Sequence, residues 1–311
     1  MRGMAQNNID LLRLAHQLLE ASHPMNLRQL HYAIFSSRQG KKIGYQNTKS
    51  EYVRLSRVTS HSRRRHRQAE LRGYGHIAIR TEIPHEWMVD ELRGAEMVSV
   101  WDNAAEYIGT LRRDYRRDLW QDQPVYVEVW CEKAAILGSL RPVTEELGVR
   151  LRPCRGFASA GMEGEIGNLF EDINKPIHVF YLGDFDPSGD IIDRDIYRRA
   201  QIAAGKDFTM TRLAIFQEDI KGFDLPPQPI KENDLRSKSF KKKYGKKAQT
   251  VEVDALPVGE LRRRVHNAIV ELIDLARWDW QTQKQEKEFK SISDLAAQWR
   301  TLPPAGTTEA S

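Results

Sequence analysis

Apolar side chains recur at helical spacing in the first part of the chain. Residues 8–22 carry them on one face, which predicts an amphipathic helix that ends before Pro24, because the residue preceding a proline avoids the α region. A second short helix is expected to begin after Asn26, a favourable N-cap residue, and a third to run from residue 47 or 48 to about residue 66. Residues 37–46, rich in glycine and lysine, predict a turn between these two helices.

The pattern changes at residues 71–82, where glycines punctuate an alternation of apolar and polar side chains. This segment predicts a β-hairpin, or wing. Helices of this kind followed by a wing are typical of the winged helix-turn-helix fold, which lays one helix in a groove of DNA. We therefore assign residues 1–83 to a winged-helix DNA-binding domain. Residues 84–122 are assigned to a polar helical connector, whose expected packing residues are Trp87, Trp101, Tyr107 and Leu111.

Beyond the connector, β-rich runs alternate with helical segments. Strands joined by crossover helices indicate a parallel sheet with both faces covered, so we expect an α/β domain over residues 123–275. This domain is expected to contain a loop at residues 225–247 and a final long amphipathic helix over residues 253–278, with a helical or disordered tail at residues 276–311. The strands are expected at residues 124–131, 149–154, 177–184 and 211–216, and the helices at residues 134–147, 161–173 and 191–204.

Composition narrows the class of protein. Apolar residues make up 40% of the chain and charged residues 29%, values typical of a folded domain. No apolar run approaches the roughly 20 residues needed to cross a bilayer, and the polar N-terminus does not have the pattern of a signal peptide. Cys131 and Cys154 are the 2 cysteines, too few for a disulfide framework or a cysteine-based zinc site. We therefore expect a cytoplasmic protein with no membrane partner.

Charge is distributed along the chain in blocks of one sign. Residues 26–80 hold 13 Lys or Arg against 2 acids, and residues 236–247 hold 7 bases and no acid, although the net charge of the whole chain is only +5. Such blocks attract a polyanion. The binding of nucleic acid is favoured further, because neutralised phosphates release counterions. The alternative is a basic face that serves solubility alone. The side chains expected to contact DNA are Arg54, Arg57, Arg63, Arg64, Arg65 and Lys133.

Carboxylates stand at the ends of two expected strands. Glu132 follows one strand, and Asp184 and Asp186 end the apolar run that begins at residue 177. Acids at the carboxyl ends of parallel strands lie at the crevice where α/β folds bind ligands, and residues i and i+2 of an extended segment point the same way. A hard divalent cation relieves the repulsion between such groups, so these three residues predict a Mg²⁺ site. The alternative for the two aspartates alone is a polar turn that caps the next helix.

These motifs resemble the Toprim domain in the A subunit of topoisomerase VI and in the related meiotic double-strand-break protein. The likeness rests on Glu132-Lys133 after a first strand and on the sequence DFDPSG, which begins at Asp184, after a later one. Residues 155–159 (RGFAS) are similar to the family's glycine-containing segment, and residues 251–265 (VEVDALPVGELRRRV) to its late helix opening. The resemblance implies a winged helix followed by a Mg²⁺-binding Toprim domain.

The family carries a catalytic tyrosine in the winged helix that precedes its Toprim domain. Here the sequence NLRQLHY matches that segment at Arg28, Leu30 and Tyr32, whereas Gln29 replaces an acid and His31 an aromatic residue. The resemblance implies that Tyr32 attacks double-stranded DNA. It also implies a homodimer, in which the tyrosine of one protomer meets the metal of the other, and a separate B-type ATPase subunit as a further partner.

The residue types at Tyr32 and Arg28 fit this chemistry independently of the resemblance. A tyrosine hydroxyl, with a pKa of about 10, attacks poorly unless its developing charge is stabilised. Arg28, one helical turn before Tyr32, can offer a guanidinium to the phenolate or to the scissile phosphate. The resemblance covers most of residues 25–275, and we expect an A-subunit-like type IIB topoisomerase relative, associated with the nucleoid, that cleaves DNA through a tyrosyl phosphodiester. Two alternatives stay open: a hydrolytic Toprim nuclease in which Tyr32 only packs, and a DNA-binding protein without catalytic activity.

Overall fold

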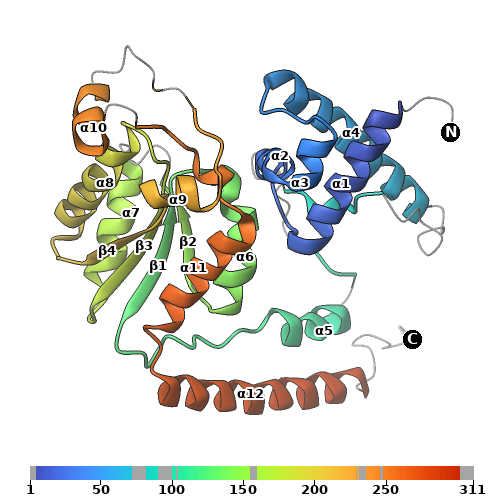
Figure 1. Ribbon diagram of the computed structural model, residues 1–311. Coiled ribbons are helices and arrows are strands. Elements are labelled where there is room, and N and C mark those ends of the chain that lie inside the picture. Colours follow the sequence, from blue (N-terminus) through green and yellow to red (C-terminus); the bar gives the residue numbers. More distant parts are fainter. Residues whose placement is uncertain are drawn as a thin grey trace. The chain divides into compact units, whose positions relative to one another are not determined.

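The computed structural model contains two compact units (Figure 1). One comprises Met1–Arg93 with Val127–Glu271, and the other comprises Gly94–Tyr126 with Leu272–Ser311. The chain therefore leaves the first unit after the N-terminal helices, returns to it at the first strand and leaves it again before the last helix. The structure describes residues 5–71, 82–89, 100–102, 104–154, 160–228, 230, 236–245 and 248–301.

The first unit opens with a helical region. It consists of α1 (Gln6–Ser22), α2 (Leu27–Ser36), α3 (Arg38–Lys42), α4 (Lys49–Leu71) and the short 3₁₀ turn η1 (His85–Trp87). The three predicted helices are confirmed, and α4 continues beyond its predicted end. Their apolar faces share one core, which includes the fully buried Leu11, Leu30 and Leu55. Asn26 caps α2 as predicted, since its side chain accepts a hydrogen bond from the Gln29 N–H at 2.8 Å and the Gln29 side chain accepts one in return.

The turn predicted at residues 37–46 is wrong in one respect, because α3 forms inside it. Oγ of Ser37 accepts a hydrogen bond from the Gly40 N–H at 2.8 Å and so caps this helix. A Cβ atom at Gly40 would overlap the carbonyl oxygen of Ile34, so the glycine permits a close approach of two backbones. The wing expected at residues 71–82 lies almost entirely outside the described residues.

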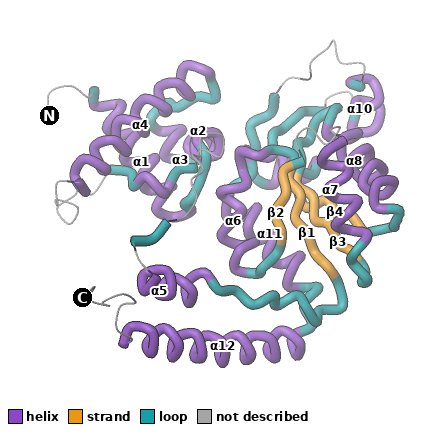
Figure 2. Tube along the Cα trace, turned by 180° about the vertical axis from the view of Figure 1, so that it is seen from behind, coloured by secondary structure: helices purple, strands orange, loops and turns teal. Residues whose placement is uncertain are grey.

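A four-stranded parallel sheet forms the centre of the rest of the first unit. Its strands are β1 (Tyr126–Cys131), β2 (Arg150–Pro153), β3 (Ile177–Leu182) and β4 (Thr209–Ala214), in the order β2-β1-β3-β4. The intervening helices are η3 (Ala134–Ile136), α6 (Leu137–Glu146), α7 (Ala160–Glu171), α8 (Gly189–Ala204) and α9 (Gln217–Gly222). Figures 1 and 2 show α7 and α8 on one side of the sheet and α6 on the other, together with the later helix α11 (Val258–Val270). The predicted α/β class with a covered parallel sheet is confirmed, and the arrangement is Rossmann-like.

The loop predicted at residues 225–247 is wrong, because it contains helix α10 (Ser237–Tyr244). This segment is lysine-rich, but Phe240 is almost fully buried. Its ring lies 5.1 Å from that of Phe185 and 4.8 Å from that of Tyr244. Burial of this aromatic cluster therefore stabilises a helix that the polar composition of the segment conceals.

The single long helix predicted at residues 253–278 is also wrong. The chain instead forms the 3₁₀ turn η4 (Val253–Ala255), then α11, then α12 (Leu275–Thr301), so most of the expected tail at residues 276–311 is helical. Pro257 stands at the N-terminal end of α11, where a missing N–H is tolerated. Before α12, the side chain of Gln123 bonds both the N–H and the carbonyl of Asp274, at 2.8 and 3.1 Å. A distant residue thus satisfies the backbone at the second break.

The second unit is built mainly from α12 and α5 (Ala104–Asp114). Trp120 and Trp278 meet edge to face, with ring centroids 6.0 Å apart, and the Tyr115 hydroxyl donates to Glu288 at 2.5 Å. Two of the expected connector packing residues, Trp101 and Tyr107, contact each other but remain 38% and 46% exposed. Trp87, a third, packs instead against the core of the N-terminal helices. No helix in the described ranges is both long enough and apolar enough to span a membrane.

Candidate functional site

Glu132 and Asp184 meet at the carboxyl-terminal end of the two inner strands of the sheet. Glu132 directly follows β1 and Asp184 follows β3, and these strands are neighbours in the sheet. The Glu132 N–H donates to the carbonyl of Leu182 at 2.9 Å, which extends the pairing of the two strands. The Asp184 N–H in turn donates to Oε2 of Glu132 at 2.9 Å. The parallel topology therefore brings two of the three predicted metal ligands together.

Asp186 lies beside these groups but also caps a helix. Its Oδ1 accepts a hydrogen bond from the Gly189 N–H at 2.5 Å, at the start of α8. Its charge contributes to raising the pKa of Glu132, behind the larger effect of burial. A Cβ atom at Gly189 would overlap the carbonyl oxygen of Asp184, which explains the glycine that ends the DFDPSG motif. The alternative predicted from the sequence, a turn that caps the next helix, is therefore confirmed for Asp186.

Burial makes the charged state of these acids unfavourable. Asp184 is only 8% exposed. Burial raises its pKa to about 7, against the opposing effect of the Lys133 ammonium and with a further contribution from the charge of Glu132. Burial also raises the pKa of Glu132. A site that holds carboxylates at this cost is stabilised by any cation that enters it.

Lys133 provides such a cation from within the chain. Its Nζ lies 3.2 Å from Asp184, 3.0 Å from Asp254 and 3.5 Å from Glu252. Burial by itself would lower the pKa of Lys133, but the carboxylates of Asp254, Asp184 and Glu252 outweigh that effect and raise it. The lysine expected to contact DNA therefore stands as an ammonium ion among acids, two of which the sequence analysis did not single out.

The donor atoms fit Mg²⁺, although no ready-made cluster holds it. Oε1 of Glu132 and Oδ2 of Asp186 accept no hydrogen bond from any described residue, so both are available to a hard cation. Across the described ranges, no three His, Cys, Asp or Glu side chains stand close enough to hold a metal ion as they are. Each oxygen of Asp184 already has one partner, since Oδ2 pairs with Lys133 and Oδ1 accepts from the Val253 N–H, so a metal at Asp184 would share its oxygens with these groups.

The raised pKa of Asp184 predicts how Asp184→Asn alters stability. A carboxyl group whose pKa is higher in the folded state than in the unfolded state stabilises the fold most at low pH, and this contribution is lost as the pH rises through about 7. Without divalent metal, Asp184→Asn should therefore unfold at a higher temperature than the unsubstituted protein at pH 8, with a gain of about 1–3 kcal/mol. The gain should shrink as the pH falls from 7 towards 4.

Calorimetry in a chelating buffer measures this difference in unfolding free energy. Asp224→Asn is the matched control, because the Asp224 side chain is 82% exposed and the same substitution there removes no buried charge. Equal unfolding temperatures for Asp184→Asn and the unsubstituted protein at pH 8 would show that the buried carboxylate carries no such cost.

Tyr32 lies on α2 with its ring buried and its hydroxyl directed at polar groups. The side chain is 3% exposed. Its hydroxyl donates to Oε2 of Glu252 at 3.1 Å and accepts from Nε2 of Gln228 at 3.0 Å. Burial, and then the charge of Glu252, raise the pKa of Tyr32 to about 12. Tyr32 therefore packs as a core aromatic does, but it also presents a neutral, hydrogen-bonded hydroxyl to a carboxylate.

Arg28 joins the same cluster. Its Nη1 lies 2.6 Å from Oε2 of Glu252, the oxygen that also accepts from the Tyr32 hydroxyl. Burial opposes the charged state of Arg28, but Glu252 outweighs it and raises the pKa of the guanidinium. Glu252 therefore connects Arg28 and Tyr32 on α2 with Lys133 at the end of β1, and Lys133 connects them with Asp184. The predicted Tyr32 and Arg28 are therefore connected with Asp184, and through the Asp184 N–H with Glu132, in one network of contacts.

The two departures from the tyrosine motif have local structural roles. Gln29 completes the cap of α2 and donates to Oγ of Ser139 at 2.9 Å. The ring of His31 contacts the Tyr45 hydroxyl at 2.7 Å and Oδ1 of Asn47 at 3.0 Å. Burial lowers the pKa of His31, so the ring is neutral at physiological pH. Neither side chain competes with Glu252 for the hydroxyl of Tyr32.

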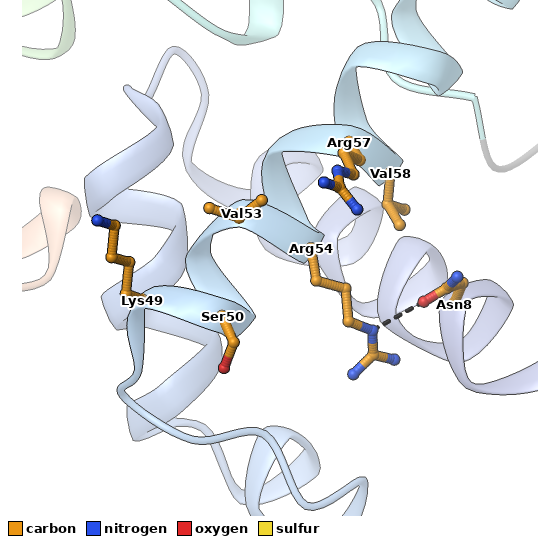
Figure 3. A pocket seen from close by; sticks show the side chains of 7 residues that line it. All are labelled: Asn8, Lys49, Ser50, Val53, Arg54, Arg57 and Val58. Carbon is orange, nitrogen blue, oxygen red and sulfur yellow. Dashed lines mark hydrogen bonds between the residues drawn. The ribbon is translucent and has the colours of Figure 1, made fainter.

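The arginines of α4 fall into different environments. Arg54 donates to Oδ1 of Asn8 at 2.8 Å (Figure 3). It also donates to the carbonyl of Asn7 at 2.7 Å, and these two hydrogen bonds connect α4 with α1. Arg57 lines a surface pocket together with Arg54 and Asn8 (Figure 3). Its side chain is exposed and makes no ion pair or hydrogen bond with any described residue. Arg64 is exposed as well, and Arg63 is partly buried. The side chain of Arg65 is not among those that the structure describes.

These environments predict which arginines carry DNA affinity. Replacing both Arg57 and Arg64 with alanine should lower the slope of log affinity against log salt by about one unit for each phosphate that the protein no longer neutralises. Arg54→Ala should instead lower the unfolding temperature, since it removes the hydrogen bonds between α4 and α1. Fluorescence anisotropy with labelled duplex DNA over a range of salt concentrations measures the slope. An unchanged slope in the double variant would assign Arg57 and Arg64 to ordinary solvated surface.

Sequence reasoning missed three members of the site: Glu252, Asp254 and Gln228. Glu252 and Asp254 stand two positions apart, as do Asp184 and Asp186, so the same alternation was present in the sequence. Asp254 is 2% exposed and accepts from the Asn26 side chain at 3.2 Å, next to the helix that carries Tyr32. Gln228 lies in a proline-rich segment with no motif of its own.

Comparison with models of known protein families and with curated proteins finds no match for this chain.

Proposed function

We propose that this protein cleaves double-stranded DNA with Mg²⁺ and forms a phosphodiester between Tyr32 and a DNA strand, as a relative of the topoisomerase VI A subunit. One observation carries the proposal. The Tyr32 hydroxyl contacts Glu252, Glu252 contacts Lys133, and Lys133 contacts Asp184 at the edge of the sheet where Glu132 also lies. A tyrosine, two cations and strand-end carboxylates are the groups that phosphoryl transfer to a hydroxyl requires.

Each residue has a distinct part in this proposal. Tyr32 is the nucleophile, and Arg28 and Lys133 are the cations that bind the scissile phosphate. Glu132, Asp184 and Asp186 hold Mg²⁺, which when bound neutralises charge on the phosphate and the leaving oxygen. Both cations are paired with carboxylates in the structure, and phosphate oxygens are acceptors of the same kind.

The finer fold and the partners belong to the same proposal. The N-terminal helices are a winged helix and the parallel sheet is a Toprim domain, on the motifs quoted from the sequence. The exposed Arg57 and Arg64 on α4 support duplex DNA as the partner. A homodimer, a B-type ATPase subunit and association with the nucleoid follow from the family resemblance. The network that joins Tyr32 to Asp184 lies within one chain, so the proposal takes the tyrosine and the metal residues from the same protomer rather than from two.

A hydrolytic nuclease is the second candidate, and one observation favours it. Burial raises the pKa of Tyr32 to about 12, so the resting hydroxyl is neutral, which disfavours its attack. In a nuclease, a water molecule would attack the phosphate, and Tyr32 would serve packing alone.

Trapping a covalent adduct tests the proposed function. The full-length protein is incubated with end-labelled duplex DNA and Mg²⁺, denatured with detergent and separated by electrophoresis. A labelled species that migrates with the protein and disappears on proteolysis supports the tyrosyl phosphodiester. Mg²⁺-dependent cutting without that species would select the nuclease, and neither adduct nor cutting would leave a DNA-binding protein.

A further inference from the structure

Glu252 is the carboxylate on which the tyrosine network converges. Its Oε2 accepts the Tyr32 hydroxyl at 3.1 Å, pairs with Nη1 of Arg28 at 2.6 Å and lies 3.5 Å from Nζ of Lys133. The side chain is 23% exposed. The backbone on either side is held in place, because Val251 pairs with Phe185 and the Val253 N–H donates to Asp184. Glu252 is therefore held in place by the backbone on either side of it, and it contacts the hydroxyl oxygen of Tyr32, which is expected to react.

We propose that Glu252 is a catalytic base that accepts the proton of the Tyr32 hydroxyl as that oxygen attacks DNA, an inference that rests on the proposed function. In this step the Tyr32 oxygen forms a bond to phosphorus, and the bond from phosphorus to a deoxyribose oxygen breaks. The proton of Tyr32 passes to Oε2 of Glu252. The leaving oxygen takes a proton from water, and Glu252 later returns its own to solvent. The exchange therefore consumes no oxidant or co-reactant.

The other groups around the Tyr32 hydroxyl are unsuited to this role. Gln228 contacts the hydroxyl through its amide nitrogen, which donates and has no basic lone pair. His31 is next along α2, but its two ring nitrogens contact Tyr45 and Asn47. Of the described side chains within hydrogen-bonding distance of this hydroxyl, Glu252 alone can take up a proton.

The surroundings of Glu252 link its basicity to the presence of DNA. The charged and titratable groups that face it are Arg28 and Tyr32 from α2 and Lys133 from the end of β1, and its neighbour Asp254 shares Lys133. Burial acts to raise the pKa of Glu252, but Lys133 and then Arg28 outweigh it and hold the pKa below its usual range. A phosphate that draws these two cations away leaves a half-buried carboxylate with less positive charge beside it. Glu252 then becomes a stronger base at the moment a substrate is in place.

The pH dependence of adduct formation tests this role in the full-length protein with duplex DNA and Mg²⁺. Glu252→Gln can still accept a hydrogen bond from Tyr32 but cannot hold its proton. We expect a rate about 100-fold below that of the unsubstituted protein near neutral pH. This rate should rise roughly tenfold per pH unit, because hydroxide then removes the proton. Asp224→Asn is the control, since it also converts an acid to an amide but at a side chain that is 82% exposed and paired with Lys41, so it should retain the rate and the pH profile of the unsubstituted protein.

Glu252→Asp separates a catalytic role from a structural one. It restores a carboxylate on a shorter side chain, so it should recover part of the rate and a pH profile like that of the unsubstituted protein. Equal rates and equal pH profiles for Glu252→Gln and the unsubstituted protein would overturn the assignment. So would a result in which Glu252→Gln and Glu252→Asp are equally slow and both keep the pH profile of the unsubstituted protein. Absence of an adduct from the unsubstituted protein would instead refute the proposed function.

Discussion

Replacing Tyr32 with phenylalanine is expected to eliminate the covalent adduct and to reduce Mg²⁺-dependent DNA cleavage by at least about 1,000-fold. The substitution keeps the buried ring but removes the oxygen that would bond to phosphorus. It also removes one hydrogen bond to Glu252 and one from Gln228, so the free energy of unfolding should fall by about 1 kcal/mol. Adduct trapping measures the first effect, and urea denaturation measures the second.

Tyr45→Phe is the matched control for this experiment. Tyr45 is also 3% exposed, its hydroxyl contacts His31 at 2.7 Å, and it is not assigned to the chemistry. The control should lose comparable stability but keep its adduct. A Tyr32→Phe protein that cuts DNA at the unsubstituted rate would exclude a tyrosyl intermediate and leave the hydrolytic nuclease.

The second large effect is expected at the strand-end carboxylates. Changing Asp184 and Asp186 together to asparagine should reduce Mg²⁺-dependent cleavage by at least about 1,000-fold, because the cation that neutralises the phosphate is no longer held. Thermal stabilisation by Mg²⁺ should disappear in the same variant. Affinity for duplex DNA should stay equal or rise, since negative charge near the phosphates is removed.

Asp195→Asn serves as its control. Asp195 lies on the exposed part of α8 and pairs with Arg198 and Arg199 at 3.1 and 2.7 Å. This substitution removes one acid from the same region of sequence without touching the site, so cleavage and the Mg²⁺ shift should persist. Intact cleavage by the doubly substituted protein would place the metal elsewhere, and loss of DNA binding would show that the acids have a structural role.

The role of Lys133 illustrates where local reasoning reached its limit. Its position after β1 was evident, and a surface lysine beside a basic domain is a reasonable phosphate ligand. The structure surrounds its ammonium with Asp184, Glu252 and Asp254, which the motif after β1 did not indicate. Two of these acids lie more than 100 positions further along the chain, and no periodicity links them to Lys133. These charges are far apart in the sequence, and only the folded structure brings them within ion-pair distance of each other.

Local periodicity was sufficient for the elements that carry the site. The 3.6-residue repeat and the N-cap at Asn26 define α2 and so the placement of Tyr32 on a helix. The apolar runs of β1 and β3 indicate buried parallel strands, and parallel strands end at one edge, so the meeting of Glu132 and Asp184 was predictable. These features depend on side chains close together in sequence or on a rule of topology.

Tertiary contacts decided the remainder. Burial of Phe240 converts a lysine-rich segment into α10, and Gln123 satisfies the backbone at the break before α12. The contact between Tyr32 and Glu252 joins residues 220 positions apart. The sequence by itself determined helices α1, α2, α4, α6, α7 and α8, the four strands and the end of the sheet at which acids collect, because each depends on local pattern or strand direction. Only the tertiary structure decided which carboxylate meets the tyrosine, because that depends on how distant segments pack, and a local pattern carries no record of such packing.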